Sequence, residues 1–170
     1  NDGQTINTLA IQNAIDSCSI KGGTVIFPAG DFLTGTLYLK SNVTIHLSEN
    51  AKLIGSTNIK DYPHNSPEYK FYGDTWVKQS LIYAEKQENI AISGNGTIDG
   101  QGWAFKNSIR KKPDRYMNRP YVLWFVECTN VKVEDIFMTN SAMWMQHYLA
   151  CNKVRISGIR VFNHCNKNND

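Results

Sequence analysis

Cys128-Thr129-Asn130-Val131-Lys132-Val133 and Cys151-Asn152-Lys153-Val154-Arg155-Ile156 are two versions of one segment. In both segments apolar residues alternate with polar ones, which is the period of a β-strand. The separation between the two cysteines also separates Trp124 from His147 and His147 from Asp170, and we call it the short step. A constant step of this size in strand-rich sequence predicts the stacked coils of a solenoid, with Trp124, His147 and Asp170 along one face.

The repeat extends toward the N-terminus, where Asn42-Val43-Thr44-Ile45 and Asn89-Ile90-Ala91-Ile92 begin like Asn130-Val131. The anchors lie at positions 43, 90, 131 and 154, and we interpret the three steps between them as two coils, nearly two coils and one coil. The sequence therefore predicts an all-β, single-stranded parallel β-helix. Neighbouring coils of such a solenoid lie about 4.8 Å apart.

Helical spacing of apolar residues occurs only near the start, at residues 7–19, with Thr5 or Asn7 as the N-cap candidate and Gly22-Gly23 as the stop. The first coil of a solenoid has an open apolar end, so we expect this helix to cap it. Short strands are predicted at residues 24–27, 32–39, 43–47 and 52–54. Residues 61–78 and 103–119 break the rhythm of the coils, and their aromatic side chains favour ordered loops that form walls.

Length and charge limit the possible functions. The 170 residues contain no Ser/Gly-rich or Pro-rich linker, so we expect a single domain over 1–170. A net charge of +3 is far from the basic surface of a nucleic-acid-binding protein, although the small excess of Lys and Arg suits an anionic substrate. No apolar run is long enough to span a membrane, and no targeting signal is present within these residues.

The four cysteines do not have the spacing of a zinc site. Cys128 and Cys151 should lie on neighbouring coils, because they are one short step apart. Two interpretations stay open, namely small buried thiols in a ladder, or a disulfide involving Cys18, Cys128, Cys151 or Cys165.

The quoted motifs together resemble one family. They are Gly94-Asn95-Gly96-Thr97-Ile98-Asp99-Gly100-Gln101-Gly102 with Trp103, then Arg119-Pro120, Phe125, Cys128-Thr129-Asn130-Val131, Asn140-Ser141, Trp144, Cys151-Asn152-Lys153-Val154 and Asn168-Asn169-Asp170. Their order and spacing are similar to those of the polygalacturonase family, glycoside hydrolase family 28, in its bacterial type. The glycines do not form a dinucleotide fingerprint, and we expect them to allow positive φ at corners between strands, with contact between the backbone and a sugar as the alternative.

The resemblance implies a right-handed parallel β-helix that hydrolyses α-linked galacturonic acid in pectin with inversion, using three aspartates and neither metal nor cofactor. Asp170 matches one of the three, with Asn169 where the family has Thr. The remaining motifs would lie beyond residue 170, so the domain is expected to be truncated at its C-terminal end. Because inversion needs two carboxyl groups roughly 6.5–9.5 Å apart, this chain alone is expected to be inactive.

The candidate site residues each have two interpretations. Asp170 is either a turn residue or the catalytic carboxylate, and Asn168 either a turn residue or a group that orients Asp170. His147 is either a packed histidine or a group that binds a uronate carboxylate and tunes the Asp pKa. Trp144 and Trp124 either stack on sugar rings or fill the core. Arg119 lies either beside the cleft or in a buried ion pair.

The expected partner is a pectic polysaccharide or oligogalacturonide, bound by a monomer that is secreted or periplasmic, with no nucleic acid and no membrane. The basic residues Arg110, Lys111, Lys112 and Arg115 slightly favour exo action, because a basic loop can close one end of a cleft and bind a chain terminus. Ala142 departs from the usual Pro of the family's Asn-Ser-Pro and leaves the choice between galacturonan and rhamnogalacturonan open. Alternatives are a non-catalytic carbohydrate-binding β-solenoid and, ranked lower, a calcium-dependent pectate lyase.

Overall fold

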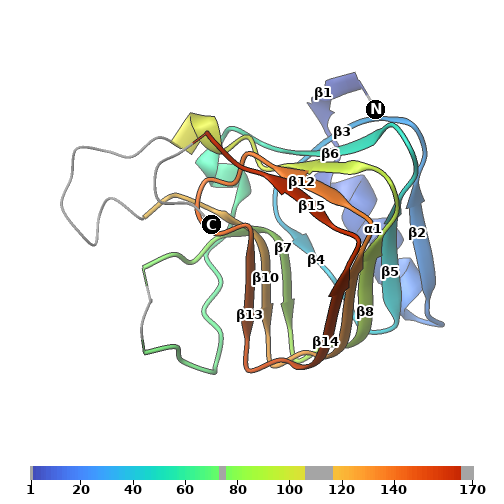
Figure 1. Ribbon diagram of the computed structural model, residues 1–170, viewed down its shortest axis with the longest axis vertical. Helices are drawn as coiled ribbons and strands as arrows, with labels where there is room; N and C mark the ends of the chain where they lie inside the picture. Colours follow the sequence, from blue (N-terminus) through green and yellow to red (C-terminus); the bar gives the residue numbers. More distant parts are fainter. Residues whose placement is uncertain (1, 73–75, 106–116, 166–170) are drawn as a thin grey trace.

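The computed structural model describes residues 2–72, 76–105 and 117–165 (Figure 1). It is a parallel β-helix of the expected right-handed kind, with one α-helix at its N-terminal end. The elements are β1 (Asp2–Ile6), α1 (Thr8–Ser19), β2 (Gly23–Phe27), β3 (Gly30–Thr34), β4 (Leu37–Tyr38), β5 (Val43–Leu47), β6 (Ala51–Gly55), η1 (Ile59–Asp61), β7 (Ser80–Glu85), β8 (Glu88–Ser93), β9 (Thr97–Asp99), η2 (Gly102–Phe105), β10 (Tyr121–Val126), β11 (Thr129–Glu134), β12 (Phe137–Thr139), β13 (Gln146–Leu149), β14 (Asn152–Ser157) and β15 (Arg160–Phe162).

The strands form three parallel sheets, which the chain visits in a fixed cycle. We call them sheet A (β1-β3-β6-β9-β12-β15), sheet B (β14-β11-β8-β5-β2) and sheet C (β13-β10-β7-β4). Each coil runs from sheet B to sheet A to sheet C, and the next coil begins again in sheet B. The corner between sheets A and C contains residues 35–36, 56–79, 100–120 and 140–145 in successive coils.

The register of sheet B corrects the predicted number of coils. Val131 pairs with Ile90 on one side and with Val154 on the other, and Ile45 pairs with Ile92. The anchors are therefore aligned as predicted, but each of the two longer steps, from position 43 to 90 and from 90 to 131, is a single coil. The extra length is the inserted loops of residues 56–79 and 100–120, which leave the sheets at the corner between A and C.

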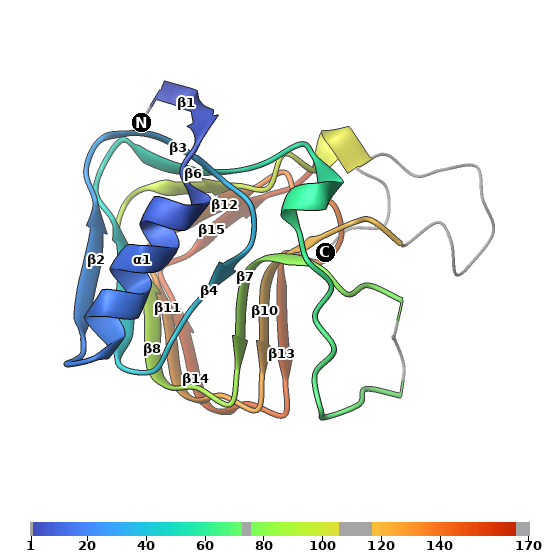
Figure 2. The ribbon, with the colours of Figure 1, turned by 180° about the vertical axis from the view of Figure 1, so that it is seen from behind.

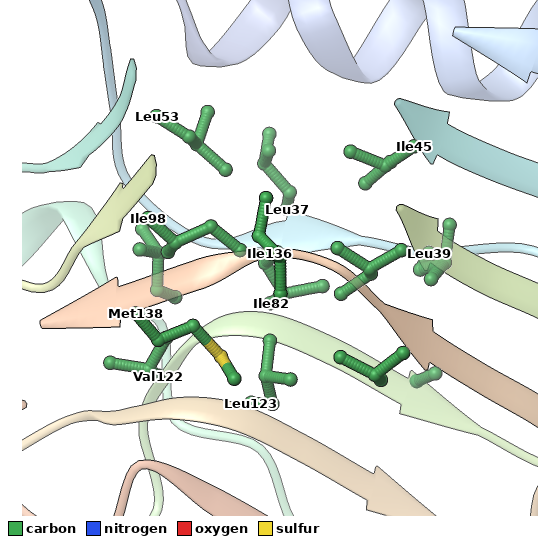
Figure 3. Packing of buried hydrophobic residues seen from close by; sticks show 14 of the residues in the cluster. Leu37, Leu39, Ile45, Leu53, Ile82, Ile98, Val122, Leu123, Ile136 and Met138 are labelled. Carbon is green, nitrogen blue, oxygen red and sulfur yellow. The ribbon is translucent and has the colours of Figure 1, made fainter. Parts of the chain in front are cut away.

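The interior of the coil is filled by the apolar residues of the period-2 pattern (Figure 3). Val43, Ile45 and Leu47 of β5 are fully buried and alternate with partly exposed Thr44 and His46. The inward side chains of the three sheets meet there, for example Ile45 from sheet B, Leu53 from sheet A and Ile82 from sheet C. Stacking thus gives every coil the same apolar interior, which holds the sheets at fixed positions.

The N-terminal helix covers the first coil, as predicted (Figure 2). It begins after Asn7 and buries Ile11 and Ile15 against the core. The preceding strand β1, which the sequence did not predict, extends sheet A beside β3. The predicted strand at residues 32–39 is two strands, because Gly35 packs against the Asp61 carbonyl and the Thr36 amide donates to the same carbonyl at 3.0 Å.

A column of asparagines marks the entry to sheet B. Asn42, Asn89 and Asn130 all have left-handed φ values of 63°, 54° and 55°. Their side chains form a ladder in which Asn89 donates to Asn42 at 2.9 Å and Asn130 donates to Asn89 at 2.7 Å. In the next coil Lys153, with φ 56°, occupies the ladder position, because Asn152 lies one residue earlier and pairs with Thr129.

The glycine-rich segment has a different physical role from the predicted one at most of its positions. Gly94 has the expected positive φ of 107°. Gly96, Gly100 and Gly102 are instead required by close packing, since a Cβ at Gly102 would lie 2.4 Å from the Ala142 nitrogen of the next coil. Glycine here allows the corner loops of adjacent coils to touch through their backbones.

Candidate active site

Aromatic side chains form a column on the outward face of sheet C. Tyr38, Tyr83, Trp124 and His147 occupy equivalent positions of β4, β7, β10 and β13. Ring centroids of successive members are 6.0, 5.2 and 6.3 Å apart, and the last pair is stacked with an interplanar angle of 4°. The strand spacing alone creates this column, because each coil repeats the outward position.

A second pair of rings lies beside the column. Tyr121 stacks on Trp144 at 5.6 Å, and both rings meet His147 at 5.2 and 5.1 Å, respectively. Phe71, from the loop of residues 56–79, also contacts His147, with ring centroids 5.7 Å apart. His147 is therefore held by aromatic rings from two coils and a loop, which fixes the orientation of its imidazole.

The loop of residues 56–79 covers part of this face. Its base is fixed by Tyr62, whose buried hydroxyl donates to the Ser56 carbonyl at 2.7 Å and whose ring packs on Phe105 at 5.8 Å. Gln79 donates to the Tyr62 carbonyl at 3.1 Å, which joins the two ends of the loop. Because this covering lies outside and the core lies inside, every residue of β10 is buried.

One carboxylate joins the loop to the column. Glu85 accepts a hydrogen bond from the Tyr83 hydroxyl at 2.8 Å and another from the Glu68 amide at 2.9 Å. Lys86 forms an ion pair with Glu68 beside it. Burial, followed by the bond to Glu85, raises the pKa of Tyr83 well above its ordinary value of 10.0. The phenol thus stays a hydrogen-bond donor at neutral pH.

A cavity of about 520 Å³ lies between the loop and sheet C. Its floor contains Tyr121, Trp124 and His147, and its loop side contains Lys70 and Lys78. Lys70 donates to the Pro67 carbonyl at 2.7 Å, and the ion pairs found among the described residues involve neither lysine. The cavity combines aromatic faces with positive charge, which suits a ligand with a flat apolar face and a carboxylate.

The structure brings together three of the six predicted site residues. Trp124 is 5% exposed and lies under the other rings, while Trp144 and His147 are partly exposed beside it. Trp124 thus packs against its neighbours in an apolar cluster on the outward face of sheet C, separate from the interior of the coil. Asn168 and Asp170, and the basic residues at 110–112 and 115, lie outside the described residues.

Arg119 has a buried position, with 2% of its surface exposed. Its Nε donates to the Ala142 carbonyl at 2.7 Å, in the corner loop of the next coil. This geometry favours a role in holding the corner of residues 140–145, and hence Trp144, over direct contact with a sugar.

Sequence reasoning missed Tyr83, Tyr121 and Lys78 as parts of this face. A signal for Tyr83 was present, since the step that joins Ile90 to Val131 also leads back from Trp124 to Tyr83. The Lys78 position had no comparable signal, because the path of a long loop is set by tertiary contacts.

Among residues 2–72, 76–105 and 117–165, no group of three or more His, Cys, Asp or Glu side chains is arranged to hold a metal ion. Within the same part of the chain, no helix is long and apolar enough to cross a membrane.

Comparison with known proteins gives consistent matches. Residues 17–170 match the profile of "Glycosyl hydrolases family 28". The chain is 32% identical over 169 residues to a "Probable polygalacturonase" of Vitis vinifera, covering 94% of this chain and 34% of the relative. It is 42% identical over 109 residues to an "Exo-poly-alpha-D-galacturonosidase" of Dickeya chrysanthemi, covering 60% of this chain and 18% of the relative.

Among solved structures, the family 28 exopolygalacturonase of Yersinia enterocolitica superimposes with a TM-score of 0.80 at 26% identity, covering 98% of this chain and 38% of that one. The chain thus spans well under half of the length of these relatives.

Proposed function

We propose a function from one premise, namely that the chain belongs to family 28 of the glycosyl hydrolases. The protein that contains these coils hydrolyses α-galacturonosyl bonds in pectic polysaccharide, with inversion of configuration and without a cofactor. The observation that carries this proposal is the outward column of sheet C. Trp124 and His147 stand in register there, one short step apart, and the same step leads on to Asp170.

An inverting glycosidase needs one carboxylic acid to protonate the leaving group and one carboxylate to activate water on the opposite face of the sugar. In our proposal Asp170 belongs to the carboxylates that activate the water, and Asn168 orients it. The other carboxylate comes from the further length of protein that the relatives have, since this chain spans 34% of the Vitis relative.

The described residues supply the substrate face in this proposal. Lys70 and Lys78 attract the carboxylates of galacturonosyl units, because cations beside a low-dielectric cavity concentrate anionic ligands, and the imidazole of His147 supplies a hydrogen-bonding group on the floor of the same cavity. The exposed part of Trp144 contacts a sugar ring, and Trp124 supports His147 from below. Arg119 acts as a positioning residue through the Ala142 carbonyl.

Exo action is favoured over endo action. The described residues of the loop of residues 56–79 border the cavity on sheet C and can limit the length of chain that this face accepts. Relatives from Dickeya and Yersinia have exo-acting names. We further propose one domain over 1–170, a monomer, and a secreted or periplasmic location, where the polymer is accessible.

The test is a reducing-end assay on polygalacturonate and on rhamnogalacturonan, with a chelator present, for the full-length protein and for the chain of residues 1–170. The full-length protein should release galacturonate monomer from polygalacturonate, and NMR should show the inverted anomer first. Asp170→Asn should abolish turnover while retaining binding. The chain of residues 1–170 should bind oligogalacturonide without cleaving it.

Three results would contradict the proposal. Turnover by the chain of residues 1–170 would show that the assigned carboxylates are wrong. An unsaturated product that appears only when calcium replaces the chelator would indicate a lyase. Binding without turnover by the full-length protein would indicate a non-catalytic carbohydrate-binding solenoid.

A further inference from the structure

Two cysteines lie side by side where the chain passes from sheet C to sheet B. Cys128 and Cys151 immediately precede Thr129 and Asn152, which are paired in register between β11 and β14. The Asn152 amide donates to the Cys128 carbonyl at 2.8 Å, so the two backbones are adjacent. Neighbouring strands are about 4.8 Å apart, which is within the roughly 4.4–6.8 Å between the Cα atoms of a disulfide.

The two thiols point into the same space. Cys128 is fully buried, and its Sγ is 3.3 Å from the Val126 carbonyl. Cys151 is partly exposed, and its Sγ is 3.4 Å from the carbonyl of Phe125, a residue of the same coil as Cys128. Both sulfurs therefore lie against the end of β10.

The environments of the two sulfurs differ. A hydrogen bond from Cys128 lowers the pKa of Cys151, and this effect exceeds the opposing effect of burial. The same hydrogen bond, together with burial, raises the pKa of Cys128. The more exposed sulfur is thus the one that forms a thiolate more readily, and thiolates are the attacking species in thiol–disulfide exchange.

We propose that Cys128 and Cys151 are a redox-active pair that forms a disulfide between adjacent coils. The Cys151 thiolate attacks a small-molecule disulfide and releases one thiol, giving a mixed disulfide. Cys128, as its thiolate, then attacks the Cys151 sulfur and releases the second thiol. Two protein thiols are oxidised, and one molecule of reagent disulfide is reduced to two thiols.

The other cysteines do not share this geometry. Cys18 belongs to α1 at the opposite end of the solenoid and lies near Gly23. Cys165 directs its Sγ to the Ser141 carbonyl at 3.2 Å, at the corner between sheets A and C. None of the four cysteines is joined to another in the structure. This inference does not depend on the proposed hydrolase activity.

The test treats the chain of residues 1–170 with excess oxidised glutathione, followed by alkylation under denaturing conditions and peptide mass mapping. Two of the four thiols should become resistant to alkylation, and the intact mass should fall by about 2 Da. The peptides of Cys128 and Cys151 should be cross-linked, and dithiothreitol should reverse the link. Closing the loop between them should raise the melting temperature by about 10 °C.

Single-cysteine variants distinguish this pair from other pairings. Cys151→Ala and Cys128→Ala should each leave no cross-link, whereas Cys18→Ala should cross-link like the parent chain. Cys128 is fully buried, so the peptide map of the parent chain decides the question if Cys128→Ala does not fold. Continued alkylation of all four cysteines, a stable glutathione adduct on Cys151, or a link to Cys18 or Cys165 would overturn the proposal.

Discussion

The asparagine ladder allows a quantitative test of what holds adjacent coils in register. Asn130→Ala removes the 2.7 Å hydrogen bond from Asn130 to Asn89 and places alanine at a φ of 55°. The lost bond costs about 1 kcal/mol, at the net value of a protein hydrogen bond. The left-handed backbone costs a residue with a Cβ roughly another 1 kcal/mol. The free energy of unfolding should therefore fall by about 2 kcal/mol.

Two companion variants separate the contributions. Asn130→Gly loses the bond but tolerates the backbone, so it should cost about 1 kcal/mol. Lys153→Asn adds an asparagine at the next ladder position, where φ is 56°, and should stabilise the protein by up to about 1 kcal/mol because the new side chain can donate to Asn130.

The assay is urea unfolding followed by circular dichroism, with the slope against urea compared between variants. Thermal unfolding should follow, with a shift of about 6 °C for Asn130→Ala in a chain of this size. Equal losses in the free energy of unfolding for Asn130→Ala and Asn130→Gly would refute the free-energy cost assigned to the left-handed backbone. If Lys153→Asn is no more stable than the parent chain, the stabilisation assigned to each hydrogen bond of the ladder is wrong.

Three further predictions concern the site and its supports. His147→Ala should weaken binding of trigalacturonate by about tenfold, by the loss of roughly 1.4 kcal/mol, as measured by calorimetry, with His164→Ala as the control. Gly102→Ala should lower the free energy of unfolding by about 2 kcal/mol, because its Cβ would lie 2.4 Å from the Ala142 nitrogen; unchanged urea unfolding would contradict this packing. Because the pKa of Tyr83 is raised above the ordinary value of 10.0, only the unfolded state ionises just above that pH, so stability should decrease as pH rises beyond it. Tyr83→Phe should flatten that decrease in a pH series of urea midpoints, and identical pH profiles would show that the buried phenol contributes nothing.

The period-2 pattern and the repeated step predicted the fold, since the inward residues of β5, β8 and β11 alternate with polar ones and keep one register. The pattern did not distinguish a long coil from two coils, because an inserted loop lengthens the step without changing the period. It also could not identify β10 as covered on both faces, which depends on the path of residues 56–79.

The candidate site was predicted in part. The short step correctly placed Trp124 beside His147. It gave no information on Lys70 and Lys78, which reach the cavity through a loop with no repeat. A buried position was one of the two alternatives for Arg119, but the local sequence could not identify the carbonyl of the next coil that Arg119 contacts.

At the corner between sheets A and C, the loops differ in length from coil to coil while the strands on either side keep the same structure. Its segments range from residues 35–36 to residues 56–79, yet the strands on either side keep their pairing. The entropic cost of lengthening a flexible loop grows slowly, by about 0.6 kcal/mol for each doubling. Loop length can therefore change by insertion and deletion at this corner, while the pairing of the stacked strands remains unchanged. For protein engineering, the same corner is the natural place to exchange loops between relatives.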